Sequence, residues 1–430
     1  MPSSAFRRAR CIGTVPENRT ELPPGGGRNA GDSVPYGASG KESALEKRFF
    51  HAKEDPARVR VNSVDPVFLI LVLVLLALGL TMLWSASFPQ SEYDSNYTES
   101  TRYLYKQALC AVLGLGCMAA FSRIPAELWR RAAWQIYGIS IALLLAVLVV
   151  GQSVNGAKRW VSIAGIQFQP SEIAKFAVIL VFARLSRAYG PKAAEFRYGI
   201  LGFGSALMGI LIPLALEKHL SAILLIGMVA VVMMFLSGTR MKYLMMGAAL
   251  AVVFVLVYIT FMGYAGDRVT AWLDPSSDPS DTGYQILQSL YAIGSGGIFG
   301  LGFGRSRQKY LYLPFQYNDY IFAIVCEELG LVGALGIMLL FAALILRGYH
   351  IALHARDRFS SMLAAGLTTL LAVQTVLNLC VVTNLLPSTG IALPFFSYGG
   401  TALAVNLGEM GVILGISRQR EEAKLQEEAI

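Results

Sequence analysis

The chain has 430 residues, of which 55 % are apolar and only 15 % are charged, and its formal net charge is +8. Soluble domains carry about 25 % charged residues, and disordered chains are poor in apolar residues, so this composition excludes both as the dominant class. It leaves a membrane protein that crosses the bilayer several times. We do not expect a nucleic-acid partner, because no basic stripe interleaved with aromatic residues occurs.

Both ends of the chain differ from its middle. Residues 1–60 combine a Pro-Pro-Gly-Gly-Gly run with scattered charges and show no helical or strand period, which predicts a disordered basic cytoplasmic tail. Residues 419–430 are charged and predict a short cytoplasmic tail. Residues 61–418 are expected to form one membrane domain.

Ten apolar runs follow one another within that domain. A bilayer core of about 30 Å needs about 20 helical residues, and each run approaches this length. The sequence therefore predicts an all-α polytopic membrane protein with ten transmembrane helices. The runs cover residues 66–87, 107–121, 133–151, 171–187, 199–215, 221–237, 244–262, 320–346, 361–384 and 401–417.

Lys and Arg residues gather in alternate connections between these runs, together with both tails. The opposite connections hold few of them, and the 385–400 connection has no charge. Since cytoplasmic loops are rich in Lys and Arg, both termini are predicted to be cytoplasmic. The segment from about 263 to 319 then becomes a long extracytoplasmic loop between helices seven and eight, and long connections are usually functional.

A first group of charged residues surrounds the start of the fourth run. Pro170 fits a helix start, and Glu172 and Lys175 are spaced to meet on one helix face. Two interpretations stay open: a neutralised pair inside the membrane, or a site where Lys158, Arg159 and Lys175 bind an anionic head group. Intramembrane charge favours the second interpretation.

The long loop contributes two further groups. Gln285 and Gln288 suit hydrogen bonding to sugars or amides, although turn packing explains them almost as well. A glycine-rich stretch, Gly294–Gly304, is followed by three cations that end at Lys309. It does not match a dinucleotide motif, and it could bind a diphosphate or form a solvated loop.

A last group holds three carboxylates. Asp319 is expected at the outer mouth of the eighth helix, where it could act as a general base or as a helix N-cap. Glu327 and Glu328 follow inside the helix, where carboxylates need partners or a wet cavity. We expect these two acids to be structural.

These groups occur in the order found in one known family, and together the chain resembles the shape, elongation, division and sporulation family from Asp65 to about Arg418. The glycine-rich stretch is more similar to the division and sporulation branch. The motifs that carry the resemblance are Asn155–Trp160, Gln169–Lys175, Gly283–Ser289, Gln308–Pro314, Asp319–Ala323, Glu327–Gly330 and Leu393–Gly400.

The resemblance implies a peptidoglycan glycosyltransferase that polymerises lipid II, a disaccharide-pentapeptide on undecaprenyl diphosphate, at the outer face of the cytoplasmic membrane. It implies a class B penicillin-binding protein, a transpeptidase, as partner, with other divisome or sporulation proteins. The essential aspartate of the family falls on Asp319, which becomes the expected base. Inversion at the anomeric carbon is expected for a single displacement. Substrate-binding roles are implied for Lys158, Arg159, Lys175, Glu172, Gln285, Gln288, Lys309 and Ser397.

The chain departs from the family pattern near Asp319. Phe315 stands where Glu is common, so a partner for a divalent cation, Mg or Mn, is missing there. Tyr317 and Asn318 replace the usual pair before the aspartate, and Glu217–Ala222 replaces another common motif. A lipid II flippase and a non-catalytic scaffold for the transpeptidase remain the alternative functions.

Overall fold

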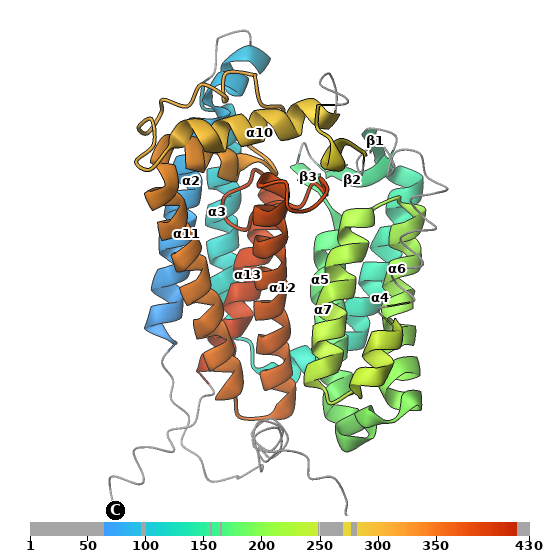
Figure 1. Ribbon diagram of the computed structural model, residues 1–430. Coiled ribbons are helices and arrows are strands. Elements are labelled where there is room, and N and C mark those ends of the chain that lie inside the picture. The colour runs from blue at the N-terminus through green and yellow to red at the C-terminus, as the bar shows by residue number, and fades with distance from the viewer. Residues whose placement is uncertain are drawn as a thin grey trace, which may run out of the picture. The chain divides into compact units, whose positions relative to one another are not determined.

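The computed structural model describes residues 64–95, 100–154, 157–163, 166–247, 249, 270–276 and 282–418, and these residues lie in one unit of the chain, Glu46–Ile430. Most of them are helical (Figure 1). The first helices are α2 (Pro66–Asp94), α3 (Arg102–Phe121), α4 (Ala126–Val150), α5 (Pro170–Tyr189), α6 (Phe203–Leu216) and α7 (Leu220–Leu236). They are followed by α10 (Thr282–Gly296), α11 (Ile321–Leu353), α12 (Arg358–Val382) and α13 (Gly400–Ser417).

Every predicted apolar run except 244–262 coincides with a helix, and that run lies largely outside the described residues. Seven helical stretches of the described chain are long and apolar enough to cross a membrane, and α7 is a shorter apolar helix of 17 residues. Helix α5 carries several charges and does not meet that criterion. The prediction of a polytopic membrane protein is thus confirmed, while the count of ten helices stays a prediction, as does the description of residues 1–60 and 419–430, which lie outside the described residues.

The helices pack in two connected groups (Figure 1). Helix α3 packs along α13, and α2 packs along α11, which in turn packs on α12. Helices α4, α5, α6 and α7 form the second group, and α12 joins the groups through its contacts with α5 and α7. Because α12 and α13 are buried along most of their length, the core lies along these two helices.

One end of the bundle carries two elements that the sequence analysis did not predict. A three-stranded antiparallel sheet, β1 (Gln152–Val154), β2 (Ala157–Ile163) and β3 (Ile166–Phe168), joins α4 to α5 in the order β1-β2-β3. In its register Ser153 lies opposite Lys158, and Ser162 lies opposite Gln167. Helix α10 lies across the ends of the upright helices in Figure 1, within the connection expected to be a loop. With 15 residues it is too short to cross a bilayer, so a search for spans misses it.

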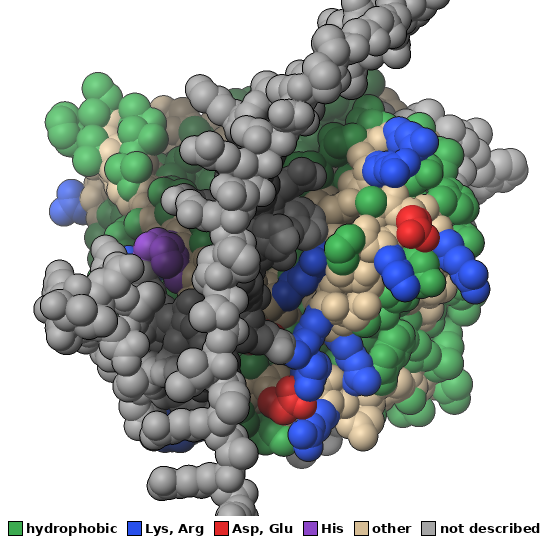
Figure 2. Space-filling model, turned by 90° about the horizontal axis from the view of Figure 1, so that it is seen from below, with side chains coloured by type: hydrophobic (Ala, Val, Ile, Leu, Met, Phe, Trp, Pro, Cys, Tyr) green, Lys and Arg blue, Asp and Glu red, His purple; other side chains and the backbone are tan. Residues whose placement is uncertain are grey.

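The opposite end carries the predicted cation-rich connections. Figure 2 views this end and shows Lys and Arg side chains gathered on it. Arg123, Arg131, Arg240 and Lys242 are exposed in the connections there. Ion pairs also tie this end together, since Arg347 lies 2.7 Å from Asp65, whose carboxylate caps α2. The predicted cations of this end are therefore present in the structure, while the orientation of the chain in the membrane stays a prediction.

Candidate active site

Asp319 lies in the turn that leads into α11, and its side chain is partly exposed. Its backbone oxygen accepts a hydrogen bond of 2.7 Å from Nδ2 of Asn378, a fully buried residue of α12. The same Nδ2 donates to the backbone oxygen of Ile391 at 2.8 Å. A Cβ atom added to Gly390 would lie 3.7 Å from Oδ2 of Asp319. Asn378 therefore holds the Asp319 turn against a loop whose glycine faces the carboxylate.

The N-cap of α11 is Tyr320, whose own side chain makes no capping hydrogen bond. The structure therefore does not bear out Asp319 as the N-cap residue. The catalytic role of the Asp319 carboxylate stays a prediction.

The loop that faces Asp319 also contacts the start of α7. Ser221, in the first turn of α7, donates its hydroxyl proton to the backbone oxygen of Thr389, the residue before Gly390. This contact joins the Asp319 turn to the short turn between α6 and α7. Residues from four distant parts of the sequence thereby line one end of the bundle.

His219 organises the turn between α6 and α7. Its Nδ1 accepts a hydrogen bond of 3.1 Å from the backbone of Ala222, which caps α7. The neutral ring then carries its proton on Nε2, which lies 2.8 Å from Nε2 of the Gln169 side-chain amide. Burial, with the charges of Arg159 and Lys175, lowers the pKa of His219 to about 3. His219 is therefore a neutral link between α7 and the start of α5.

The predicted contact between Glu172 and Lys175 is present in α5, with 2.6 Å between the carboxylate oxygen and Nζ. Both side chains are buried. Glu409 of α13 is also buried and interacts electrostatically with both. A single lysine thus lies among two carboxylates, which is the arrangement expected where charge must be kept inside an apolar bundle. Both interpretations of this pair remain open.

Arg159 connects the sheet to the same turn. Its guanidinium donates to the backbone oxygen of Lys218 and lies near Glu217. Glu217 is only 3 % exposed, and burial raises its pKa to about 8 although Arg159 opposes the shift. Lys158 precedes Arg159 in β2. The sheet therefore brings at least one of the predicted cations to the turn that contacts the Asp319 loop.

Glu328 and Lys309 form a buried ion pair away from this surface. Nζ of Lys309 lies 2.9 Å from Oε1 of Glu328, and Ser85 of α2 donates to the same carboxylate at 2.7 Å. The carboxylate therefore neutralises Lys309, which the sequence analysis assigned to substrate binding. That assignment stays a prediction, and the geometry gives it no support.

Glu327 anchors the glycine-rich segment to α11. It accepts hydrogen bonds from the hydroxyl of Ser306 and from the backbone of Arg307, the latter at 2.9 Å. The helix is kinked at Gly330, whose φ of 67° and missing Cβ let the backbone of Gly300 approach closely. Both acids thus hold the loop in place, as expected of structural carboxylates.

The remaining predicted residues have local partners. Gln285 donates from α10 to the backbone oxygen of Pro314 at 3.1 Å, which fixes the segment before Asp319. The hydroxyl of Ser397 accepts from the backbone of Leu393 at 2.7 Å and so stabilises its own turn. Gln288 is half-buried in α10. Their contribution to substrate binding is untested.

Sequence reasoning did not single out Asn378, His219 or Glu409. Glu409 offered a signal, because it is a carboxylate inside an apolar run, like Glu327. Asn378 offered none, since its function comes from two backbone oxygens far away in the sequence.

A divalent cation was considered because of the family resemblance. Within the described residues, no three His, Cys, Asp or Glu side chains gather closely enough to hold a metal ion. Phe315, at the position where the family often has a carboxylate, is half exposed and offers no ligand atom. We therefore assign no step to a metal ion.

The chain is similar to several known proteins. A model of the FtsW, RodA and SpoVE family, described as "Cell cycle protein", matches residues 66–422. A probable peptidoglycan glycosyltransferase FtsW from Geobacter sulfurreducens (strain DL-1 / KN400) is 37% identical over 365 residues, 84% of this chain and 97% of that protein. Stage V sporulation protein E of Bacillus subtilis is 37% identical over 362 residues, 83% of this chain and 98% of that protein.

Solved structures extend the likeness to the fold. A chain from a study of the structural coordination of polymerization and crosslinking by a peptidoglycan synthase complex has a TM-score of 0.70 and 28% identity, and the match covers 84% of this chain and 99% of that one. The rod shape determining protein RodA of Thermus thermophilus has a TM-score of 0.62 and 27% identity over 83% of this chain and 97% of that one. The chain therefore belongs to the FtsW, RodA and SpoVE family of cell cycle proteins.

Proposed function

We propose that this chain is a peptidoglycan glycosyltransferase that polymerises lipid II in cell division or sporulation. One observation carries the proposal: Asp319 lies partly exposed beside Gly390, and the loop of Gly390 contacts the α7 turn through Ser221 and Thr389. Arg159 donates a hydrogen bond to the backbone oxygen of Lys218 in that turn. A carboxylate and a cationic group are thus joined at one end of the bundle.

Asp319 supplies the base for glycosyl transfer. Its carboxylate takes the proton from an acceptor sugar hydroxyl while the hydroxyl oxygen forms a bond to the anomeric carbon of the donor. The bond between that carbon and the diphosphate oxygen breaks, and the lipid diphosphate departs with the electron pair. A single displacement inverts the anomeric configuration.

The cations near the α7 turn stabilise the departing diphosphate. Arg159 provides a planar fork that suits phosphate oxygens, and Lys158 is its neighbour in the strand. Lys175 is buried and paired with Glu172, so Arg159 and Lys158 carry this role. Positive groups that are already in position before the reaction stabilise the negative charge that develops on the diphosphate leaving group.

We infer that this end of the bundle faces the outside of the cell. The cation-rich end in Figure 2 then faces the cytoplasm, with both termini, as the distribution of Lys and Arg predicts. The neighbouring solved structure comes from a complex that couples polymerization with crosslinking. A crosslinking transpeptidase of the class B penicillin-binding type is accordingly the expected partner.

The test is polymerisation of labelled lipid II by the purified chain with its partner. We expect glycan strands from the wild type and a loss of about 100-fold or more in rate for Asp319→Ala, which removes the base. Asp274→Asn is the matched control, because it neutralises an exposed carboxylate in a loop. Equal polymer from the wild type and Asp319→Ala would exclude the proposed mechanism.

The flippase alternative draws on the buried group of Glu172, Lys175 and Glu409, since transporters also keep charge inside the membrane. It predicts that the chain alone moves lipid II across vesicle membranes. Movement that requires Lys175 and survives Asp319→Ala would favour this alternative over the enzyme.

A further inference from the structure

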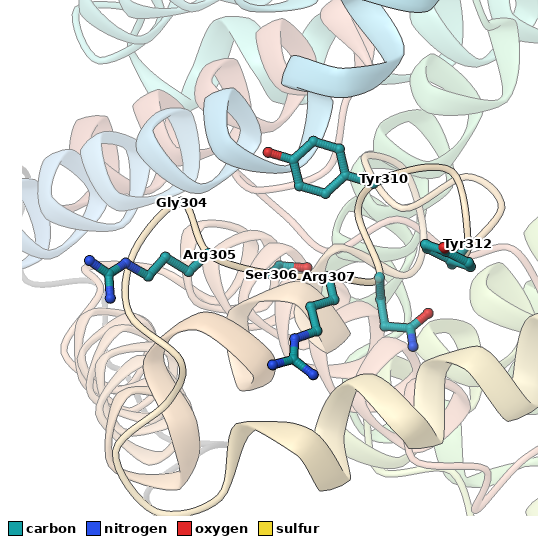
Figure 3. Close-up of a pocket in the computed structure, with 7 residues that line it drawn as sticks. Gly304, Arg305, Ser306, Arg307, Tyr310 and Tyr312 are labelled. Atoms are coloured by element: carbon teal, nitrogen blue, oxygen red, sulfur yellow. The ribbon is translucent and has the colours of Figure 1, made fainter.

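A cleft of about 740 Å³ lies in the segment between the glycine-rich stretch and Asp319, and it is not part of the surface around Asp319 described above (Figure 3). Two arginines, two tyrosines and an amide surround it. The lining residues are Gly304, Arg305, Ser306, Arg307, Gln308, Tyr310 and Tyr312.

The backbone of this segment is held firmly, so the cleft has a fixed floor. Ser306 is buried and bonds to Glu327 through its hydroxyl, and the amides of Arg307 and Gln308 donate to the same carboxylate. Ser306 is buried whereas its two neighbours Arg305 and Arg307 are exposed, and Figure 3 shows the two arginine side chains extending from the segment in different directions. The two guanidinium groups are thus presented on a rigid base.

The charges of these two arginines are not neutralised. Both are exposed, and neither forms an ion pair within the described part of the chain. Lys309, two residues further on, differs, because Glu328 takes up its charge. Two guanidinium forks together with tyrosine hydroxyls are donors suited to phosphate oxygens.

Apolar side chains in the stretch that precedes the cleft residues point to a ligand that is attached to lipid. Ile298 and Phe303 are exposed, and Phe299 is 82 % exposed. Phe303 also contacts Trp84 of α2, with 6.4 Å between the ring centroids. Exposed aromatic and aliphatic groups beside cations are typical of the membrane interface.

We propose that this cleft is a second binding site for a lipid-linked diphosphate, with Arg305 and Arg307 binding the phosphate oxygens. The inference rests on the proposed function. Joining two lipid-linked saccharides requires that two diphosphates be held at once, one on the donor and one on the acceptor. Arg159 and its neighbours account for one of them, and the cleft supplies cations for the other.

The test measures binding of undecaprenyl diphosphate to the full-length protein in nanodiscs. Arg305→Ala with Arg307→Ala is expected to weaken binding at one of two sites about tenfold or more while the site near Arg159 keeps its affinity, because two charge-assisted contacts are lost. Arg305→Lys with Arg307→Lys keeps the charge without the fork and should fall between. Arg240→Ala with Lys242→Ala is the control, since it removes two exposed cations beyond the far end of α7.

Phosphatidylglycerol serves as the second probe. Equal weakening for both lipids would overturn the proposal in favour of a general surface for anionic head groups, and unchanged binding of undecaprenyl diphosphate would overturn it outright. Failure of the proposed function has a different signature. Weaker binding in the double alanine variant, with equal polymer from the wild type and Asp319→Ala, would preserve this site and remove the mechanism.

Discussion

The acids in α11 and the acid in the turn between α6 and α7 are all buried, but they differ in their hydrogen bonds. Glu327 and Glu328 are fully buried, and each accepts hydrogen bonds from hydroxyl groups and backbone amides. Glu217 is almost as buried, but its Oε1 has no hydrogen-bond partner among the described residues. Satisfied acids stabilise a fold, whereas an acid held without partners marks a place where the fold gives up stability.

The carboxylate of Asp319 meets neither condition. Its carboxylate is partly exposed beside a glycine, while the backbone around it is fixed by Asn378. The comparison therefore separates the buried acids that hold the loop from the partly exposed carboxylate of Asp319. Variants in each region should affect different quantities.

The largest effect on stability is expected at Glu328. Glu328→Ala leaves Lys309 buried and unpaired, and breaking one partner of a buried ion pair costs about 3–5 kcal/mol. We expect a large fall in the melting temperature in detergent. Glu328→Leu combined with Lys309→Leu removes both charges and should recover much of the loss. A double variant as unstable as Glu328→Ala would contradict the view that this pair is structural.

At Asn378, in contrast, the larger effect is expected on the reaction rate rather than on stability. Asn378→Ala removes the two hydrogen bonds that hold the Asp319 turn against the loop of Gly390. We expect kcat to fall about 10- to 100-fold with a smaller change in KM, because a displaced base loses alignment with the acceptor hydroxyl. Thr375→Val is the control on the same helix, since Thr375 bonds only to its own helix backbone at Leu371. Equal losses in both variants would indicate a general effect on α12.

The two regions also differ in how far the sequence could predict them. Hydropathy located the helices, and the spacing of Glu172 and Lys175 predicted their contact, because both are properties of short stretches. The ordered motifs predicted the family, which the comparisons confirm.

Features that depend on tertiary packing could not be predicted. The pairing of Lys309 with Glu328 joins residues 19 positions apart through a kinked helix, and it leaves Arg305 and Arg307 as the exposed cations of that loop. Helix α10 and the small sheet could not be predicted because neither is long enough to be recognised as a membrane-spanning segment. Local sequence patterns thus predict the helices, whereas contacts between distant elements decide which charged side chains are paired and which are exposed.

The smallest effect is predicted for Glu217, the buried acid whose Oε1 has no hydrogen-bond partner among the described residues. Burial raises its pKa from 4.5 to about 8, so between these values the folded state holds a proton that the unfolded state has lost. Stability should therefore fall as the pH rises through this window. The unfolded-state His219 is still half protonated at pH 6.5, so it opposes this slope slightly there and adds nothing above about pH 7.5.

The measurement is the melting temperature of the protein in detergent at pH 6.5 and pH 8. The wild type is expected to lose roughly 1–1.5 kcal/mol of stability over this interval, because the slope of about 1.4 kcal/mol per pH unit halves as the pH reaches the pKa of Glu217. Glu217→Gln cannot ionise and should show a much flatter profile, while Glu195→Gln, which changes an exposed acid, should follow the wild type. A Glu217→Gln profile as steep as that of the wild type would place the titrating group elsewhere, and the turn between α6 and α7 would then lose its distinction from the carboxylates of α11.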